Sequence, residues 1–99
     1  MARPAIHPGE HLTDELQELD MSASQLAKEF GIPANRVTEI LRGRRGISAD
    51  TALRLARWMG TTAQFWMNLQ RNYELRLAEQ EHGDQIRQEV RPRADHEAA

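Results

Sequence analysis

Apolar residues recur along this chain at spacings of three and four, the period of an amphipathic helix. No window shows the strict alternation of apolar and polar residues that a half-buried strand requires. The apolar stripes, and the glycines and serines between them, predict an all-α fold of five helices. Their expected ranges are from just after Pro8-Gly9 to about Asp20, Ala23 to Phe30, Ala34 to Arg42, Ala49 to Met59, and about Thr62 to Glu81.

Residues with strong preferences for helix ends set these boundaries. Ser22 followed by Gln25 is a capping-box pattern, and Gly31 suits the left-handed backbone that ends a helix. Similar signals mark the later helices: Ser48 as a cap, Gly60 as a stop, Thr61 with Gln64 as a second capping box, and His82-Gly83 as the end of the fifth helix. Residues 1–83 are therefore predicted to form one domain. The polar segment 84–99 is expected to be frayed or disordered.

The helical spacing also predicts which side chains form the core. The expected inward positions are Leu12, Leu16 and Leu19; Leu26, Ala27 and Phe30; Val37, Ile40 and Leu41; Ala52, Leu53, Ala56 and Met59; and Phe65 with Leu69. The fifth helix carries more apolar residues than one core-facing stripe needs, and an apolar surplus of this kind marks an interface. We assign Trp66, Tyr73 and Leu77 to a dimer interface, which makes this helix a candidate dimerisation helix.

Residues 23–42 have the pattern of a helix-turn-helix. Two short helices flank Gly31-Ile32-Pro33, and Ala27 is small where the second helix must cross the first closely. A generic helical hairpin needs only an apolar face. The small residue at 27 and the glycine at 31 therefore favour a helix-turn-helix over two helices of an ordinary bundle.

The formal net charge of −2 conceals a segregation of charge along the chain. Residues 34–57 carry six arginines, at positions 36, 42, 44, 45, 54 and 57, against two acids. Residues 1–33 and 58–99 have balances of −4 and −2. Binding to a polyanion depends on the local potential, so the central arginines are a candidate nucleic-acid contact. An ordinary solvated, charge-mixed surface is the alternative.

In a helix-turn-helix, the second helix enters the major groove with its N-terminal residues at the base edges. The expected base-reading residues are Ala34, Asn35, Arg36, Thr38 and Glu39. The expected contacts to the DNA backbone are Ser22, Ala23 and Ser24 at the start of the second helix, together with Arg42, Arg44 and Arg45. Arg54 and Arg57 are expected instead to pair with acids of the protein. For each of these residues the alternative is an ordinary exposed position.

Several stretches make the chain resemble the HigA-type antitoxins of bacterial toxin–antitoxin modules, within the phage-repressor-like XRE family. They are His7-Pro8-Gly9-Glu10, Gly43 to Ser48, Ala52 to Ala56, and Phe65 to Gln70 with Asn72-Tyr73. The resemblance covers about residues 7–82. It implies a five-helix domain that binds a near-palindromic operator in double-stranded DNA as a homodimer. It also implies repression of its own operon and neutralisation of a RelE-like HigB ribonuclease toxin.

Two points qualify the details of this resemblance. Pro33 stands where relatives often have a Ser or Thr cap on the recognition helix, which puts one phosphate contact in question. The surface that would bind a toxin has two candidates, the acidic first helix and the polar tail from Asp84. A regulator of the same fold with no toxin partner, and a helix-turn-helix that no longer binds DNA, are the alternatives.

Composition excludes other classes of protein. The chain has no cysteine, which suits the cytoplasm and removes disulfides and thiolate chemistry. Its histidines lie near the two ends, and no nucleophile, base and phosphate cradle converge, so we expect no enzyme activity and no cofactor. His7 and His11 are a weak metal pair because Pro8-Gly9 interrupts the helix between them. No apolar run is long enough for a signal peptide or a membrane span, so no membrane partner is expected.

Overall fold

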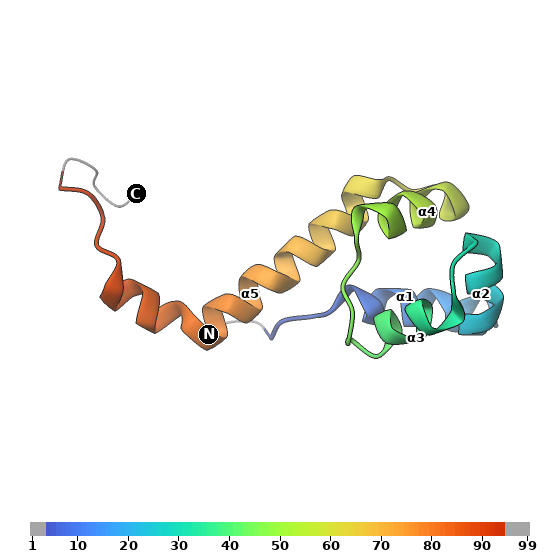
Figure 1. Cartoon of the computed structure of the whole chain (residues 1–99), viewed down its shortest axis with the longest axis horizontal. Coiled ribbons are helices and arrows are strands. Elements are labelled where there is room, and N and C mark those ends of the chain that lie inside the picture. Colours follow the sequence, from blue (N-terminus) through green and yellow to red (C-terminus); the bar gives the residue numbers. More distant parts are fainter. Residues whose placement is uncertain (1–3, 95–99) are drawn as a thin grey trace.

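The computed structural model describes residues 4–94 and confirms the all-α fold (Figure 1). Its helices are α1 (Pro8–Glu18), α2 (Ala23–Phe30), α3 (Ala34–Leu41), α4 (Ala49–Met59) and α5 (Ala63–Glu89). The first four helices and the start of α5 form a globule, and the rest of α5 extends away from it (Figure 1). No helix within residues 4–94 is long and apolar enough to cross a membrane.

The predicted helix ends in the helix-turn-helix are confirmed. The Gln25 N–H donates to Ser22 Oγ at 3.2 Å, and the Ser22 N–H donates to Gln25 Oε1 at 2.8 Å, so both bonds of the capping box are formed. Gly31 ends α2 with φ 70°, a left-handed conformation that glycine adopts without strain. Pro33 stands at the N-cap of α3, and no side chain caps that helix.

The core contains most of the predicted residues, but Leu19, Leu53 and Phe65 are exposed. It consists of Leu12, Leu16, Leu26, Ala27, Phe30, Val37, Ile40, Ile47, Ala52, Leu55 and Trp66. Leu19 is 53% exposed because it is the C-cap of α1, where the chain turns away. Leu53 is 64% exposed, whereas Leu55 is buried. Because α4 packs on both α2 and α5, its buried stripe is centred on Ala52 and Leu55 rather than on Leu53.

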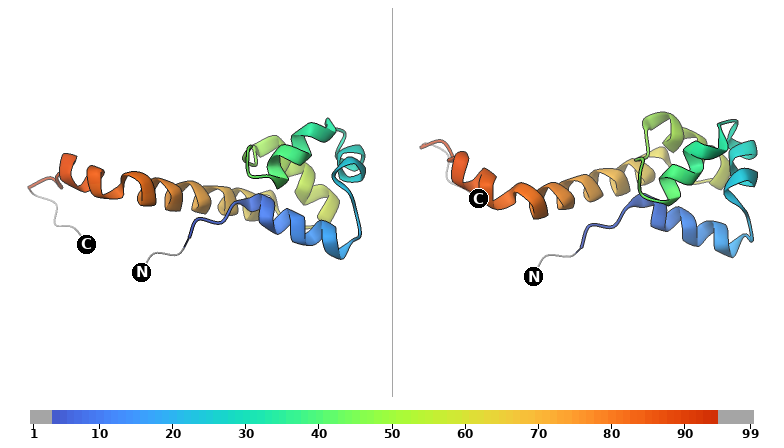
Figure 2. Two further views of the ribbon diagram at one scale, coloured as in Figure 1. Left: turned by 90° about the horizontal axis from the view of Figure 1, so that it is seen from below. Right: turned by 60° about the horizontal axis from the view of Figure 1, so that its bottom comes forward.

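The close crossing of α1 and α3 fixes the recognition helix on the globule. A Cβ atom built on Gly9 would lie 2.0 Å from the carbonyl oxygen of Ile40, which is far inside van der Waals contact. Only glycine therefore allows the start of α1 to meet the end of α3 at this distance. In both views of Figure 2, α1 runs along the lower edge of the globule and α3 lies above it.

The predicted end of α5 at His82-Gly83 was wrong, because the helix continues to Glu89. Arg87 explains part of this continuity: its guanidinium contacts Glu79 and Asp84, each at 2.6 Å, and so bridges Gly83 on the helix surface. One glycine inside a helix costs only about 1 kcal/mol. Residues 84–89 of the expected disordered segment are thus helical, residues 90–94 are not, and residues 95–99 lie outside the described part of the chain.

Candidate nucleic-acid interface

The first turn of α3 presents a polar surface to solvent. Ala34 and Asn35 are exposed, and Arg36 is partly exposed, with 35% of its side-chain surface accessible. Thr38 lies one turn later, where its hydroxyl donates to the Ala34 carbonyl at 3.1 Å. The inward positions of the same helix, Val37 and Ile40, are fully buried. The helix therefore keeps its predicted base-reading residues on its outer side, where they are open to a ligand.

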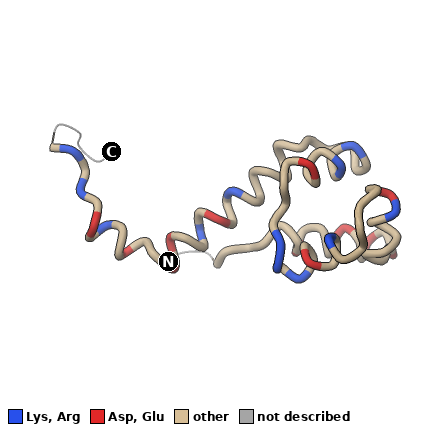
Figure 3. Tube along the Cα trace, viewed as in Figure 1, with Lys and Arg blue, Asp and Glu red and all other residues tan. Residues whose placement is uncertain are grey.

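The loop after α3, residues 43–47, carries two further cations and is called the arginine loop below. Arg44 and Arg45 are exposed, as is Arg42 just before them. Figure 3 shows basic positions gathered in this part of the globule. The arginine loop thus extends the polar face of α3 with positive charge, which is the charge that contacts to DNA phosphates require.

An ion pair links the arginine loop to α3, and the sequence analysis did not anticipate it. Arg45 contacts Glu39 Oε1 through Nε at 3.0 Å and through Nη2 at 2.8 Å. Arg45, which was expected to contact the DNA backbone, is therefore paired with Glu39, which was expected to read a base. Both side chains are 40–50% exposed, so the pair contributes at most about 1 kcal/mol to stability.

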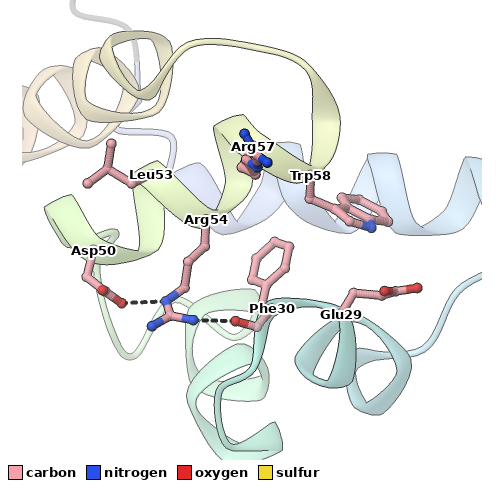
Figure 4. A pocket seen from close by; sticks show the side chains of 7 residues that line it. All are labelled: Glu29, Phe30, Asp50, Leu53, Arg54, Arg57 and Trp58. Atoms are coloured by element: carbon pink, nitrogen blue, oxygen red, sulfur yellow. Dashed lines mark hydrogen bonds and ion pairs between the residues drawn. The ribbon is translucent and has the colours of Figure 1, made fainter.

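A second network joins α3 to α4. Asp50 Oδ2 accepts from Arg54 Nε at 2.8 Å and lies 3.6 Å from Arg36 Nη1. Arg54 also donates to the backbone carbonyl of Phe30, which joins α4 to the end of α2 (Figure 4). The expectation that Arg54 pairs with an acid of the protein is confirmed. Arg57 has no acidic partner among the described residues.

Two buried polar side chains hold the arginine loop in place. The amide oxygen of Gln70, on α5, accepts from the Ile47 N–H at 2.7 Å. The His7 ring lies against the same loop, 3.8 Å from a Cβ atom built on Gly43, and its Nδ1 accepts from the Gly9 N–H at 2.9 Å. Sequence analysis missed both roles. The available signal for Gln70 was a polar residue one turn after Trp66 on an apolar stripe. His7 was named in the His7-Pro8-Gly9-Glu10 stretch and as a weak metal ligand, but not as a cap.

The two histidines near the start of α1 lie in different environments. His7 is buried and caps α1, whereas His11 is exposed and its ring meets the edge of Phe65 at 6.3 Å. Within the described residues, no three His, Cys, Asp or Glu side chains are placed to hold a metal ion.

The structure corrects one residue of the predicted dimer interface. Trp66 is 1% exposed and lies in the core, where its indole N–H donates to Thr61 Oγ1 at 3.1 Å. Phe65, which was expected in the core, is 43% exposed. The two exchange places because Thr62, not Thr61, caps α5, and because Thr61 supplies the acceptor that a buried indole needs. Tyr73 and Leu77 are partly buried, and Leu75 between them is 67% exposed.

Comparison with known proteins identifies the family. The helix-turn-helix family model matches residues 12–66. An addiction module antidote protein of a HigA family, from Coxiella burnetii, is 55% identical in sequence, with a TM-score of 0.90, and the match covers 92% of this chain and 100% of that chain. This chain belongs to the HigA family of helix-turn-helix proteins.

Two further relatives of this HigA-family chain extend the comparison. The Pseudomonas aeruginosa antitoxin HigA, solved with the higBA promoter, is 50% identical, with a TM-score of 0.87 over 89% of this chain and 97% of that chain. Virulence-associated protein I of Dichelobacter nodosus is 52% identical over 79 residues, which is 79% of this chain and 73% of that protein. The structural matches extend well beyond residues 12–66, so α5 belongs to the shared fold.

The environment of His7 predicts that the HigA-family fold loses stability in mild acid. Burial lowers the pKa of His7 below its ordinary value of 6.5, and a protonated Nδ1 can no longer accept from the Gly9 N–H. As the pH falls below about 6.5, the unfolded chain binds a proton at this position before the folded chain does. The free energy of unfolding therefore falls with pH in this window, by at most about 1.4 kcal/mol per pH unit.

Urea unfolding at pH 7.5 and pH 5.5 measures this effect. His7→Asn is the matched variant, because asparagine also caps helices but does not titrate. The wild-type protein is expected to lose more stability between the two pH values than His7→Asn does. Equal losses would show that His7 is not responsible.

Proposed function

We propose that this HigA-family protein is a sequence-specific DNA-binding antitoxin in the cytoplasm that represses its own operon as a homodimer and neutralises a RelE-like HigB ribonuclease toxin. The observation that carries the proposal is the exposed first turn of α3 beside the arginine loop. This surface occurs in a chain that is 50% identical in sequence to an antitoxin solved with the higBA promoter.

The base-reading part of the proposal follows from side-chain chemistry. Asn35 can form paired hydrogen bonds with adenine N6 and N7, and Arg36 can do the same with guanine O6 and N7. Ala34 and Thr38 offer methyl groups to a thymine methyl, and Glu39 can accept from cytosine N4. Such mixed donors, acceptors and methyl groups suit the recognition of a sequence better than charge neutralisation alone.

The residues proposed to contact the DNA backbone lie on both sides of α3. Residues 22–24 supply hydroxyl groups and N–H groups at the positive end of α2, where an anion is favoured. On the other side, Arg42, Arg44 and Arg45 supply the cations. A hollow of about 470 Å³ between the turn of the motif and the start of α4 is lined by Arg36, Arg45 and Arg54. Donors on both sides of α3 are what anchoring across a groove requires.

The homodimer is proposed from the shape of α5 and from its apolar residues. The helix extends beyond the globule. Leu75 and Ile86 on the helix, and Val90 at its C-cap, are each at least 50% exposed. A second copy would cover this surface with its own α5. Tyr73 and Leu77 lie on the opposite side of the helix, where the globule of the second copy would contact them. Two recognition helices would then meet successive major grooves about 34–36 Å apart.

The toxin is proposed to bind the outer side of α1. This helix exposes Glu10, Asp14, Glu15 and Glu18, opposite in charge to a protein that must hold RNA. Beside them, the exposed Leu19 borders a hollow of about 310 Å³ formed with Trp58 and Met59. An apolar centre with a charged rim is the usual anatomy of a protein interface. The polar segment from Asp84 is the second candidate.

Removing the two cations of the arginine loop tests the DNA-binding face. If about three arginines per protomer contact phosphates, the slope of log K against log salt is about −5 for a dimer. Arg44→Ala with Arg45→Ala is expected to weaken binding to all duplexes and to reduce that slope to about −2. Arg71→Ala with Arg76→Ala removes the same charge from α5 and should leave the slope unchanged. A slope of −5 in the first double variant would place the arginine loop off the DNA.

Sedimentation tests the homodimer. The protein is expected to sediment as a dimer at micromolar concentration, and Leu75→Glu with Leu77→Glu is expected to give a monomer because it places four charges in the proposed contact. Gln85→Glu, on the same helix but off the apolar positions, is the control and should remain dimeric. A wild-type monomer at this concentration would contradict the assignment of α5.

Co-expression tests the antitoxin function. A gene for a basic protein of roughly a hundred residues is expected beside this one, and co-expression should suppress that protein's ribonuclease activity and growth inhibition. Leu19→Glu should weaken their complex, whereas truncation after His82 should not. If the neighbouring protein neither binds nor is inhibited, the protein is a helix-turn-helix regulator without a toxin partner. Loss of the complex only on truncation would move the site to the tail.

A further inference from the structure

The buried amide of Gln70 supports the arginine loop directly. Its oxygen accepts from the Ile47 N–H at 2.7 Å, and its nitrogen donates to Glu74 Oε2 at 2.9 Å, so both ends of the amide are engaged. A Cβ atom built on Gly46 would lie 2.7–2.9 Å from the atoms of this amide. The loop backbone therefore rests on the Gln70 side chain with no room for a larger residue between them.

The His7 ring supports the same loop from the start of α1. Because Nδ1 accepts from the Gly9 N–H, the ring proton of the neutral form is on Nε2, which can donate to the backbone of Arg45. The ring also meets the edge of Tyr73 at 4.8 Å between centroids. Tyr73 follows Gln70 by about one helical turn on α5. Two successive turns of α5 thus fix the loop, one directly and one through His7.

The other end of the loop is fixed to α3. The N–H groups of Arg44 and Arg45 approach the carbonyl of Glu39, at 2.8 and 3.3 Å. The short connection between α3 and Ile47 is therefore bound at both ends by hydrogen bonds. Neither His7 nor Gln70 is exposed enough to contact a ligand on the outer face of α3, since each is 8% exposed.

We propose that Gln70 and His7 are positioning residues for DNA binding: they fix the arginine loop to α5, so that Arg44 and Arg45 stand at a set place beside the recognition helix. The inference rests on the proposed function. Without these bonds the arginines keep their charge and still attract DNA, but the loop must be ordered when an operator binds. Specific affinity falls, while the number of phosphate contacts does not.

The test makes the same substitution at two glutamines of α5. Gln70→Met keeps the approximate shape of the side chain but leaves the Ile47 N–H without its acceptor. Gln64→Met makes the same change at an exposed position of α5, where the amide bonds only to Asn68. His7→Asn is the second variant, because asparagine preserves a cap on α1 while it removes the ring from Arg45 and Tyr73.

Binding is measured to a duplex of the DNA upstream of the gene and to a random duplex of equal length, across a range of salt. Gln70→Met and His7→Asn are expected to bind the upstream duplex about tenfold more weakly, with the salt slope and the affinity for the random duplex unchanged. Gln64→Met should stay within twofold of wild type. Hydrogen exchange at the Ile47 amide should be faster in Gln70→Met at a concentration where circular dichroism shows it folded.

Three results would overturn the inference. The first is wild-type affinity for the upstream duplex in a folded Gln70→Met or His7→Asn variant, and the second is an equal loss of that affinity in Gln64→Met. The third is a flattened salt slope, which would mean that phosphate contacts were lost. If Gln70→Met does not fold, His7→Asn decides the question. If neither folds, the two residues are structural supports and the positioning role is rejected. A wild-type protein without preference for the upstream duplex would contradict the proposed function itself, and this is measured before any variant.

Discussion

The architecture depends on one close approach, between the backbone at Gly9 and the carbonyl oxygen of Ile40. Because a side chain at position 9 would lie 2.0 Å from that oxygen, the start of α1 and the end of α3 can meet only through glycine. The two residues before Gly9 use this closeness. Pro8 stands at N1, where its missing N–H costs nothing, and His7 comes near enough to contact the loop that leaves α3. Three consecutive residues thus place the recognition helix and its loop.

The local features of the fold could be predicted from the sequence because they depend on few residues. The capping box at Ser22, the turn at Gly31 and the absence of a cap at Pro33 each follow from the preferences of one or two side chains. The outward position of Asn35 follows from the helical period alone. These features position the candidate DNA-binding face, so its location could be predicted in advance.

Features that depend on distant partners could not be predicted in this way. Leu53 and Leu55 are equally apolar, and only the packing of α4 against both α2 and α5 decides which is buried. Trp66 is buried because Thr61 accepts its N–H, a contact that depends on where α5 begins. The extension of α5 past Gly83 is supported in part by ion pairs of Arg87 along the helix surface. In each case the helical period gave the kind of element. Packing between helices then decided which leucine of α4 is buried, and contacts at the start or along the surface of α5 decided the other two features.

The ion pairs explain why some arginines beside α3 are better candidates for DNA contacts than others. Within residues 4–94, the Arg45 side chain is paired only with Glu39. Both side chains are well exposed, so exchanging this partner for a phosphate costs at most about 1 kcal/mol. Arg54 differs, because it holds Asp50 and the carbonyl of Phe30 together and so joins α4 to α2. Moving it would leave a backbone carbonyl without its donor. Arg45 is therefore free to exchange partners, whereas Arg54 stays where the fold needs it.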